Sequence, residues 1–203
     1  MFEVITGCMF SGKSEELIRR LRRCQIADQH VLAFKSALDD RYSMEGIASH
    51  PHHAGTVSQP SDTFMAIPVR DVNDLLSHLN QHPFRQTGQV IGFDEVQFMD
   101  HDIIAVLEAE ANRGRRVIVA GLDLDSDGNP FGPMGDLLAV ADEVTKLTAV
   151  CVAEIDKHDH PVCGKAATRS YRLPEAHTGA LVQVGSAGVY EARCRACWAR
   201  GRT

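Results

Sequence analysis

The chain has 203 residues, of which 44% are hydrophobic and 24% charged, a balance typical of a globular protein; this length allows one full core and a small second module. Its start lacks a basic segment followed by a sustained apolar run, and no stretch approaches the ~18 apolar residues of a membrane span. We therefore expect a cytoplasmic protein without a membrane partner. Residues 151–203 hold eight Lys and Arg against five Asp and Glu, a net charge of +3. The whole chain has a net charge of −6, so residues 1–150 have −9. This negative charge disfavours an extended nucleic-acid-binding surface.

Strands and helices alternate along the first 150 residues. Apolar runs and helical periodicity predict, in chain order, a strand at 2–6, a helix at 14–29, a strand at 30–35, a short helix at 72–80, a strand at 89–94, a helix at 102–113, a strand at 116–121, a short helix at 136–143 and a strand at 144–150. Such alternation predicts an α/β fold in which helices cover a parallel sheet. Between residues 38 and 68 the periodicity fails and His, Ser, Pro and Gly accumulate, which predicts a mobile loop.

The most specific motif lies between the first predicted strand and the first predicted helix. It fits the phosphate-binding pattern G-x-x-x-x-G-K-[ST] and consists of Gly7, Cys8, Met9, Phe10, Ser11, Gly12, Lys13 and Ser14. Glycines let the backbone turn its N–H groups toward phosphate, Lys13 can reach the β- and γ-phosphates, and the Ser14 hydroxyl can hold Mg²⁺. The alternative is an ordinary strand-to-helix turn with a fortuitous lysine, but the order strand, loop, helix favours nucleotide binding.

Two acids, Asp94 and Glu95, follow the buried strand at 89–94. The carboxyl ends of parallel strands are where open α/β sheets bind ligands. We expect Asp94 to help hold Mg²⁺ and Glu95 to accept the proton of an acceptor hydroxyl as general base. Two acids after a strand are also common in solvated turns, and the phosphate-binding loop favours the catalytic interpretation.

The six cysteines fall into two groups. Cys8 lies in the phosphate-binding loop, and Cys24 lies on a helix face where a buried structural thiol is expected. The other four all follow residue 150: Cys151, Cys163, Cys194 and Cys197. Cytosolic thiols stay reduced, and four thiolates satisfy tetrahedral Zn²⁺, so these four predict a structural zinc site in preference to disulfides or redox chemistry.

The two cysteine pairs differ in spacing. Cys194 and Cys197 have the C-x-x-C spacing of a zinc knuckle. Cys151 and Cys163 are separated by eleven residues, far more than usual, and His158 and His160 in this gap are alternative ligands.

Taken together, these motifs resemble the thymidine kinases that join a phosphate-loop domain to a small zinc-binding domain. The resemblance covers nearly the whole chain and includes, besides the phosphate-binding loop, Asp40-Arg41-Tyr42, Ser49-His50, residues 93–98 (FDEVQF), Gly121-Leu122-Asp123, Pro130-Phe131-Gly132, residues 146–151 (KLTAVC) and residues 190–197 (YEARCRAC). It implies a P-loop NTPase-like kinase domain over residues 1–150 and a zinc-binding lasso domain over residues 151–203.

The resemblance also implies a reaction and the residues that perform it. The γ-phosphoryl group of ATP would pass to the 5′-hydroxyl of thymidine, with Glu95 as base, Lys13 and Arg41 stabilising charge, and Ser14, Asp94 and Gln97 serving ATP and Mg²⁺. The nucleoside would contact an apolar wall and a lasso-like loop, which correspond to Met9, Phe98, Leu122, Phe131, Val184, Gly185 and Tyr190. Family members further suggest a homotetramer that thymidine triphosphate inhibits.

The chain departs from the family pattern in several places. Ser126 stands where an aromatic is common, Ser186 where a second glycine is common, and Gly188 where an acid is common. The segments 51–60 and 152–162 are also longer than usual. These changes affect the base wall, the lasso and the zinc geometry, but not Lys13, Asp94 or Glu95.

Two other classes of function fit the same motifs. A P-loop ATPase with a zinc knuckle would act on nucleic acid, and a scaffold would bind nucleotide without turnover. The acidic body disfavours the ATPase, and the Lys13, Ser14, Asp94 and Glu95 set disfavours the scaffold. Within the kinases, deoxyuridine is the nearest rival substrate.

Overall fold

The computed structural model describes residues 1–38, 46–48, 63–82, 88–155, 162–174 and 189–202. Several residues named from the sequence lie outside these ranges, among them the candidate site residues Arg41, His158, His160, Val184 and Gly185 and the motif residues Asp40, Tyr42, Ser49, His50, Ser186 and Gly188.

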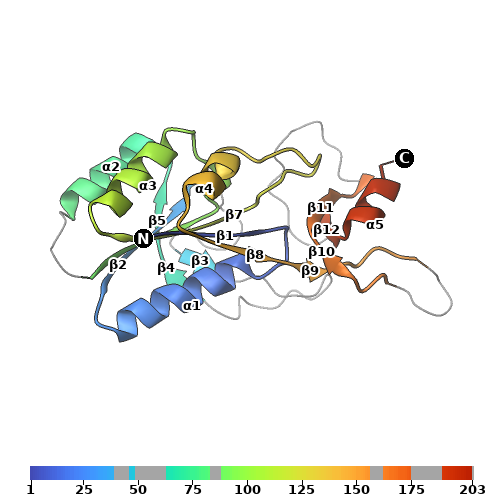
Figure 1. Ribbon diagram of the computed structural model, residues 1–203, viewed down its shortest axis with the longest axis horizontal. Coiled ribbons are helices and arrows are strands. Elements are labelled where there is room, and N and C mark those ends of the chain that lie inside the picture. Colours follow the sequence, from blue (N-terminus) through green and yellow to red (C-terminus); the bar gives the residue numbers. More distant parts are fainter. Residues whose placement is uncertain (39–45, 49–62, 83–87, 156–161, 175–188, 203) are drawn as a thin grey trace.

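A six-stranded parallel sheet forms the centre of the molecule (Figure 1). Its strands, in spatial order, are β5 (Ile67–Val69), β2 (His30–Ser36), β6 (Gln89–Asp94), β7 (Arg116–Gly121), β1 (Phe2–Gly7) and β8 (Glu143–Leu147). All six residues of β1 and of β6 are buried, because helices cover both faces of the sheet. The predicted α/β fold is therefore confirmed.

Helices cover the two faces unequally (Figure 1). The first face carries α1 (Lys13–Ile26), whose Leu17, Ile18 and Leu21 pack on the sheet. On the other face lie α2 (Val72–Gln81), α3 (Ile103–Asn112) and α4 (Met134–Val140). Close packing of α1 depends on Gly92 in β6, where a Cβ would lie 2.7 Å from Leu21 Cδ1. This packing places the first turn of α1 at the carboxyl edge of the sheet.

Part of the loop expected between residues 38 and 68 is a strand region. β3 (Gly46–Ala48) pairs antiparallel with β4 (Thr63–Met65), and β5 (Ile67–Val69) joins the edge of the main sheet. Ile47 and Phe64 are buried against the α1 side of the core. Three-residue strands are too short to give a periodic pattern, and burial of a few side chains stabilises them instead.

Several predicted boundaries also differ from the structure, most by a single residue and three by more. α1 ends at Ile26, three residues before the expected end, and α4 spans Met134–Val140 rather than 136–143, beginning directly after Pro133, whose fixed φ suits a helix start. The expected strand at 144–150 is interrupted at Thr148, which separates β8 from β9 (Ala149–Val150). A single turn of 3-10 helix, η1 (Val96–Phe98), follows β6.

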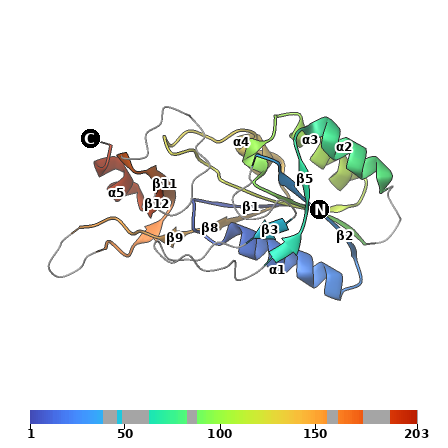
Figure 2. The ribbon, with the colours of Figure 1, turned by 180° about the vertical axis from the view of Figure 1, so that it is seen from behind.

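The four late cysteines belong to a small module at the carboxyl end of β1 and β8 (Figures 1 and 2). Within it, β9 pairs with β10 (Ala166–Ala167), and β11 (Arg169–Arg172) pairs with β12 (Tyr190–Arg193). Helix α5 (Arg195–Arg200) packs against β11 and β12. Among the residues that the structure describes, no helix is both long and apolar enough to cross a membrane.

Candidate active site and metal centre

The phosphate-binding loop connects β1 to α1 in a conformation that its glycines permit. Gly7 has φ 146°, and a Cβ there would clash with the Leu147 carbonyl, while Gly12 adopts φ 83° just before α1 begins. Lys13 is buried, and its Nζ donates a 3.0 Å hydrogen bond to the Cys8 carbonyl across the loop. The Ser11 hydroxyl is buried and makes no hydrogen bond within the described part of the chain. A buried hydroxyl in this position suits a phosphate oxygen as partner.

Ser14 and Asp94 meet at the carboxyl edge of the sheet. β7 lies between β1 and β6, yet Ser14 Oγ donates a 2.9 Å hydrogen bond to Asp94 Oδ2 because α1 projects its first turn toward β6. Both residues are buried. A hydroxyl and a carboxylate brought together beside a phosphate-binding loop are the oxygen ligands that Mg²⁺ prefers.

Glu95 is held by the backbone and by Gln97. Its φ of 56° lies in the left-handed region, which a residue with a Cβ adopts at a cost of roughly 1–3 kcal/mol, and such strain is concentrated at functional sites. Gln97 Nε2 donates a hydrogen bond to Glu95 Oε2, and Gln97 Oε1 accepts one of 3.1 Å from the Leu122 N–H after β7. The Gln97 amide therefore connects the predicted base to the end of the neighbouring strand.

Phe98 and Phe131, both predicted for the apolar wall, lie in contact. Their rings are perpendicular, with centroids 5.5 Å apart, which is a favourable edge-to-face geometry. Gly132 follows with φ 50°, and a Cβ there would clash with the Gln97 carbonyl. Both rings are only half-buried, so this pair is available to contact a ligand.

The phosphate-binding loop is also attached to the cysteine module. The Met9 N–H donates a 3.0 Å hydrogen bond to Ser170 Oγ on β11, and Cys8 Sγ lies 3.3 Å from the Ala167 carbonyl on β10. Burial raises the pKa of the Cys8 thiol, so Cys8 is a neutral, packed side chain. Sequence reasoning missed Ser170, since a contact between residues 161 positions apart leaves no local pattern.

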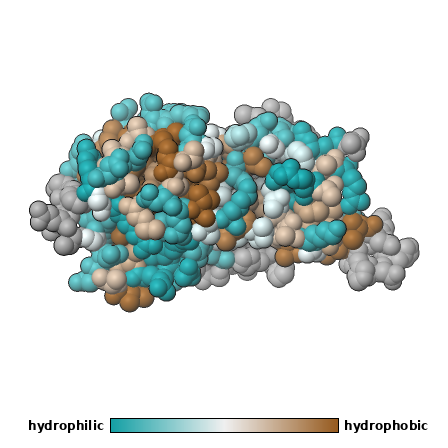
Figure 3. All heavy atoms as spheres, viewed as in Figure 1, coloured by the Kyte–Doolittle hydropathy of each residue, from teal (hydrophilic) through white to brown (hydrophobic). Residues whose placement is uncertain are grey.

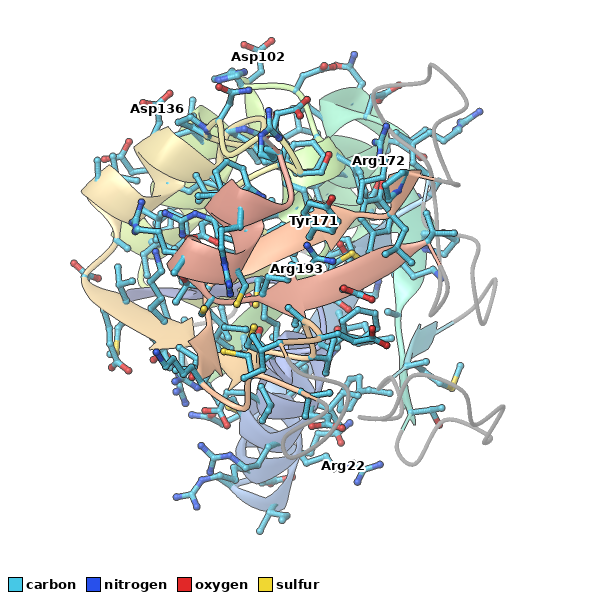
Figure 4. The ribbon with its side chains drawn as sticks, turned by 90° about the vertical axis from the view of Figure 1, so that its right-hand side faces the viewer. Arg22, Asp102, Asp136, Tyr171, Arg172 and Arg193 are labelled. Carbon is cyan, nitrogen blue, oxygen red and sulfur yellow. The ribbon has the colours of Figure 1, made fainter. Side chains whose placement is uncertain are left out.

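Tyr190 begins β12 and is buried beside Arg172. The Arg172 Nη2 donates a 3.1 Å hydrogen bond to the Tyr190 hydroxyl, and the guanidinium carbon lies 5.5 Å from the ring centroid. Farther along the same pair of strands, Arg193 stacks on Tyr171 at 3.5 Å (Figure 4). Two arginine–tyrosine contacts thus stabilise the antiparallel pair of β11 and β12.

The four predicted cysteine ligands converge. The Sγ atoms of Cys151, Cys163, Cys194 and Cys197 all lie within 4.8 Å of one another, and Cys163 and Cys194 are 4.0 Å apart. Zn–S bonds of about 2.3 Å in a tetrahedron require sulfur atoms roughly 3.8 Å apart, so the cluster fits zinc with little adjustment.

Local hydrogen bonds bring Cys151 and Cys163 together despite their long spacing in the sequence. The Cys163 N–H donates to the Ala153 carbonyl and the Gly164 N–H to the Cys151 carbonyl, each at 2.9 Å. Gly164 adopts φ 68°, which a tight turn requires. These bonds make Cys151 and Cys163 neighbours, as a close-spaced pair would be.

The thiols of this cluster differ in acidity. The backbone N–H of Cys197 lowers the pKa of Cys194 to about 7, whereas burial raises the pKa of Cys151 to about 11. Arg200 Nη2 donates a 3.0 Å hydrogen bond to Cys197 Sγ. A bound cation would favour all four thiolates, because only the deprotonated sulfur is a metal ligand.

A protein-family model described as thymidine kinase matches residues 1–198. The chain belongs to the thymidine kinase family. Membership of this family makes the chain a kinase and supports thymidine kinase activity, with ATP and thymidine as its substrates. The match extends through the cysteine module, so the module is part of the family's common architecture rather than an appendage.

In this thymidine kinase family member, most of the site residues expected from the sequence occupy one edge of the sheet. Lys13, Ser14, Asp94, Glu95 and Gln97 lie at the carboxyl ends of β1 and β6. Leu122 and Phe131 flank the segment after β7, Met9 lies in the loop, and Tyr190 lies in the module. The ion pair between Asp123 and Lys146, 2.7 Å long, connects the ends of β7 and β8 beside this edge.

Proposed function

We propose that the chain transfers the γ-phosphoryl group of ATP to the 5′-hydroxyl of thymidine, with Glu95 as general base. The observation that carries this proposal is the convergence of the phosphate-binding loop, the Ser14–Asp94 pair and a positioned Glu95 at one edge of the sheet. In the reaction the 5′-oxygen forms a bond to the γ-phosphorus, and the bond between this phosphorus and the β–γ bridging oxygen breaks as ADP leaves. The hydroxyl proton passes to a Glu95 carboxylate oxygen.

The residues supply positioning and charge rather than covalent chemistry. Lys13 exchanges its hydrogen bond with the Cys8 carbonyl for the β- and γ-phosphates, and backbone N–H groups of the loop orient the same oxygens. Ser14 and Asp94 would hold Mg²⁺, which would supply positive charge to neutralise the transferred group. Arg41 is proposed, from the family pattern, to stabilise the same charge.

Gln97 is better placed to orient Glu95 than to bind ATP. Its amide nitrogen donates to Glu95, and its amide oxygen is occupied by the Leu122 N–H. A carboxylate held in one orientation by Gln97 can be presented to the acceptor hydroxyl as its proton acceptor.

The nucleoside is proposed to lie between the apolar pair Phe98–Phe131 and the cysteine module. Met9, Leu122 and Tyr190 would complete its surroundings, with Val184 and Gly185 contributing from the lasso segment. An apolar wall favours the thymine methyl group, and backbone groups of the lasso would read the polar edge of the base.

We propose a structural Zn²⁺ bound by the four cysteines and a division into a kinase domain at 1–150 and a lasso domain at 151–203. The sulfur cluster and the start of β9 at Ala149 support these two assignments. Zinc would fix the positions of β9, β12 and α5, each of which contributes or adjoins a ligand.

The assembly and regulation that we propose follow the family. Exposed apolar side chains gather over α4 and the start of β8 (Figure 3), where Val140 is 38% and Val144 is 46% exposed. Such a strip supports contact with another copy, as in a homotetramer. Cytoplasmic location and inhibition by thymidine triphosphate belong to the same proposal, and stable binding of nucleic acid does not.

A coupled ATP-consumption assay tests the proposal. We expect turnover with thymidine and Mg²⁺, less with deoxyuridine, and no stimulation by added polynucleotide. ATP hydrolysis that requires polynucleotide and does not change when nucleosides are added would instead indicate a nucleic-acid-dependent ATPase. ATP binding without turnover under any of these conditions would indicate a scaffold.

A further inference from the structure

The segment between β7 and α4 folds into a hairpin that carries Phe131. The Asp125 N–H donates to the Asn129 carbonyl at 2.9 Å, and Leu124 and Pro130 form a β-bridge. The Asp125 carboxylate accepts hydrogen bonds of 2.9 Å from the backbone N–H groups of Asp127 and Asn129. These bonds close the hairpin tip on itself, so the segment 123–131, called here the wall hairpin, can move as one piece.

The tip of the wall hairpin docks on helix α5 and the residues after it. Trp198 Nε1 donates a 3.2 Å hydrogen bond to the Ser126 carbonyl. Arg202 Nη1 donates to the same carbonyl at 3.2 Å and to Asp127 Oδ1 at 2.8 Å. The Arg202 guanidinium carbon also lies 4.7 Å from the centre of the Trp198 ring. A main-chain acceptor shared by two side chains fixes the tip in position as well as in orientation.

Gly128 allows the tryptophan to approach the tip. Its φ is 88°, and a Cβ at this position would lie 2.9 Å from Trp198 Cη2, closer than such contacts occur. The indole ring therefore packs directly on the hairpin backbone. Any side chain at residue 128 would force the ring and the tip apart.

The contact between Trp198 and the wall hairpin connects the cysteine cluster to the apolar pair Phe98–Phe131. Trp198 directly follows the cluster cysteine Cys197. At the other end of the wall hairpin, Phe131 packs edge-to-face on Phe98. The hairpin thus spans the distance between the cysteine cluster and the apolar pair.

We propose that Trp198 and Arg202 are positioning residues that set the place of Phe131, and hence of the thymine ring, through the wall hairpin. They act through other residues and need not touch substrate. The inference rests on the proposed function in one respect, that Phe131 contacts the nucleoside. It adds a role for helix α5. Because Trp198 follows the cluster cysteine Cys197, loss of metal from the cluster would shift Trp198 and, through the wall hairpin, Phe131.

The decisive comparison is Gly128→Ala against Gly88→Ala. Gly88 has a similar φ of 64°, but a Cβ there would meet only Gln29 at 3.4 Å, an ordinary contact. Both variants carry the same kind of backbone strain, and only Gly128→Ala displaces Trp198. We expect Gly128→Ala to raise the KM for thymidine about tenfold, with the KM for ATP within about twofold, and Gly88→Ala to change neither. Equal thymidine KM values for the two variants would overturn the inference.

A second measurement does not depend on activity. Trp198 is the only tryptophan of the chain, so its fluorescence reports the docking of α5 on the wall hairpin. We expect chelation of metal, or Arg202→Ala, to shift its emission to longer wavelength, and Trp198→Phe to raise the thymidine KM less than Trp198→Ala. If neither chelation nor Arg202→Ala changes the emission spectrum, the inference is contradicted. This test still applies if Gly128→Ala fails to fold.

Failure of the inference and failure of the proposed function look different. If the wild-type protein does not phosphorylate thymidine, the proposed function fails while the fluorescence response can still be measured. If it does so and Gly128→Ala matches Gly88→Ala, only the role of the wall hairpin fails.

Discussion

Ser14 and Asp94 are 80 positions apart in the sequence, yet the Ser14 hydroxyl donates a 2.9 Å hydrogen bond to the Asp94 carboxylate. The bond passes over the end of β7, the strand that separates β1 from β6. It joins the two motifs, the phosphate-binding loop and the strand-end acids, that define the proposed chemistry.

Ser14→Ala should weaken the response to Mg²⁺. Loss of one oxygen ligand is expected to raise the Mg²⁺ concentration for half-maximal activity about tenfold, while ATP still binds through the loop. A titration of activity with Mg²⁺ measures this shift. Ser77→Ala, which alters a serine on the exposed side of α2, is the control and should leave the titration unchanged.

Glu95→Gln should abolish most of the phosphoryl transfer. The amide keeps the size of the side chain but cannot accept the hydroxyl proton, so we expect kcat to fall ~10²-fold or more with little change in ATP affinity. Steady-state kinetics with thymidine and a separate ATP-binding measurement test both halves. Turnover at the wild-type rate would remove Glu95 from the mechanism.

Gln97→Leu separates two roles for this residue. If Gln97 orients Glu95, loss of both amide hydrogen bonds should lower kcat about tenfold and leave the KM for ATP unchanged. If it binds ATP or Mg²⁺, as the family resemblance implies, the KM for ATP should rise instead. Kinetics at varied ATP and saturating thymidine distinguish these results.

Cys194→Ser should release the metal and loosen the cysteine module. We expect less than stoichiometric zinc by metal analysis, a lower melting temperature and a higher thymidine KM, since metal binding contributes folding free energy. Cys24→Ser is the matched control, because Cys24 is also buried but lies on α1, away from the cluster. Purified wild-type protein without zinc would contradict the metal assignment directly.

Glu16→Gln should change the stability of the protein in acid. Hydrogen bonds from Arg19, together with those from Arg20, lower the pKa of Glu16 from 4.5 to about 2. A carboxyl whose folded-state pKa is depressed stabilises the fold above pH 4.5, and this contribution disappears as the pH falls toward 2. We expect the variant to lose about 1 kcal/mol of unfolding free energy at pH 7, because Arg19 is exposed, and nothing near pH 2.

Urea unfolding from pH 7 to pH 2 measures this difference. Glu108→Gln, at an exposed position of α3, should follow the wild-type curve throughout. A constant gap between wild type and Glu16→Gln at every pH would show that the ionised form of Glu16 is not what stabilises the fold.

The parts of the structure that could be predicted are those encoded by neighbouring residues. The phosphate-binding loop, the strand carrying Asp94 and the amphipathic α1 each leave a pattern within about fifteen residues. The grouping of the four cysteines was also predictable, because tetrahedral zinc requires four ligands whatever their spacing.

Features that depend on distant packing could not be predicted. β3 and β4 are three residues each and owe their existence to the burial of Ile47 and Phe64. Ser170 reaches Met9 across 161 positions, and the contact between Trp198 and Ser126 joins segments 72 residues apart. None of these leaves a periodic or motif signal, since the partner is set by the fold rather than by sequence neighbours.

The two hydrogen bonds between the phosphate-binding loop and the cysteine module limit how such enzymes can be recombined. Because Met9 is held by Ser170, and Cys8 lies against the Ala167 carbonyl, the loop that receives ATP takes part of its shape from residues far beyond it. A chimera that exchanges the module of this chain for that of a relative would alter the support beneath the ATP phosphates as well as the nucleoside contacts. Grafts intended to change base selectivity should therefore retain residues 167–170.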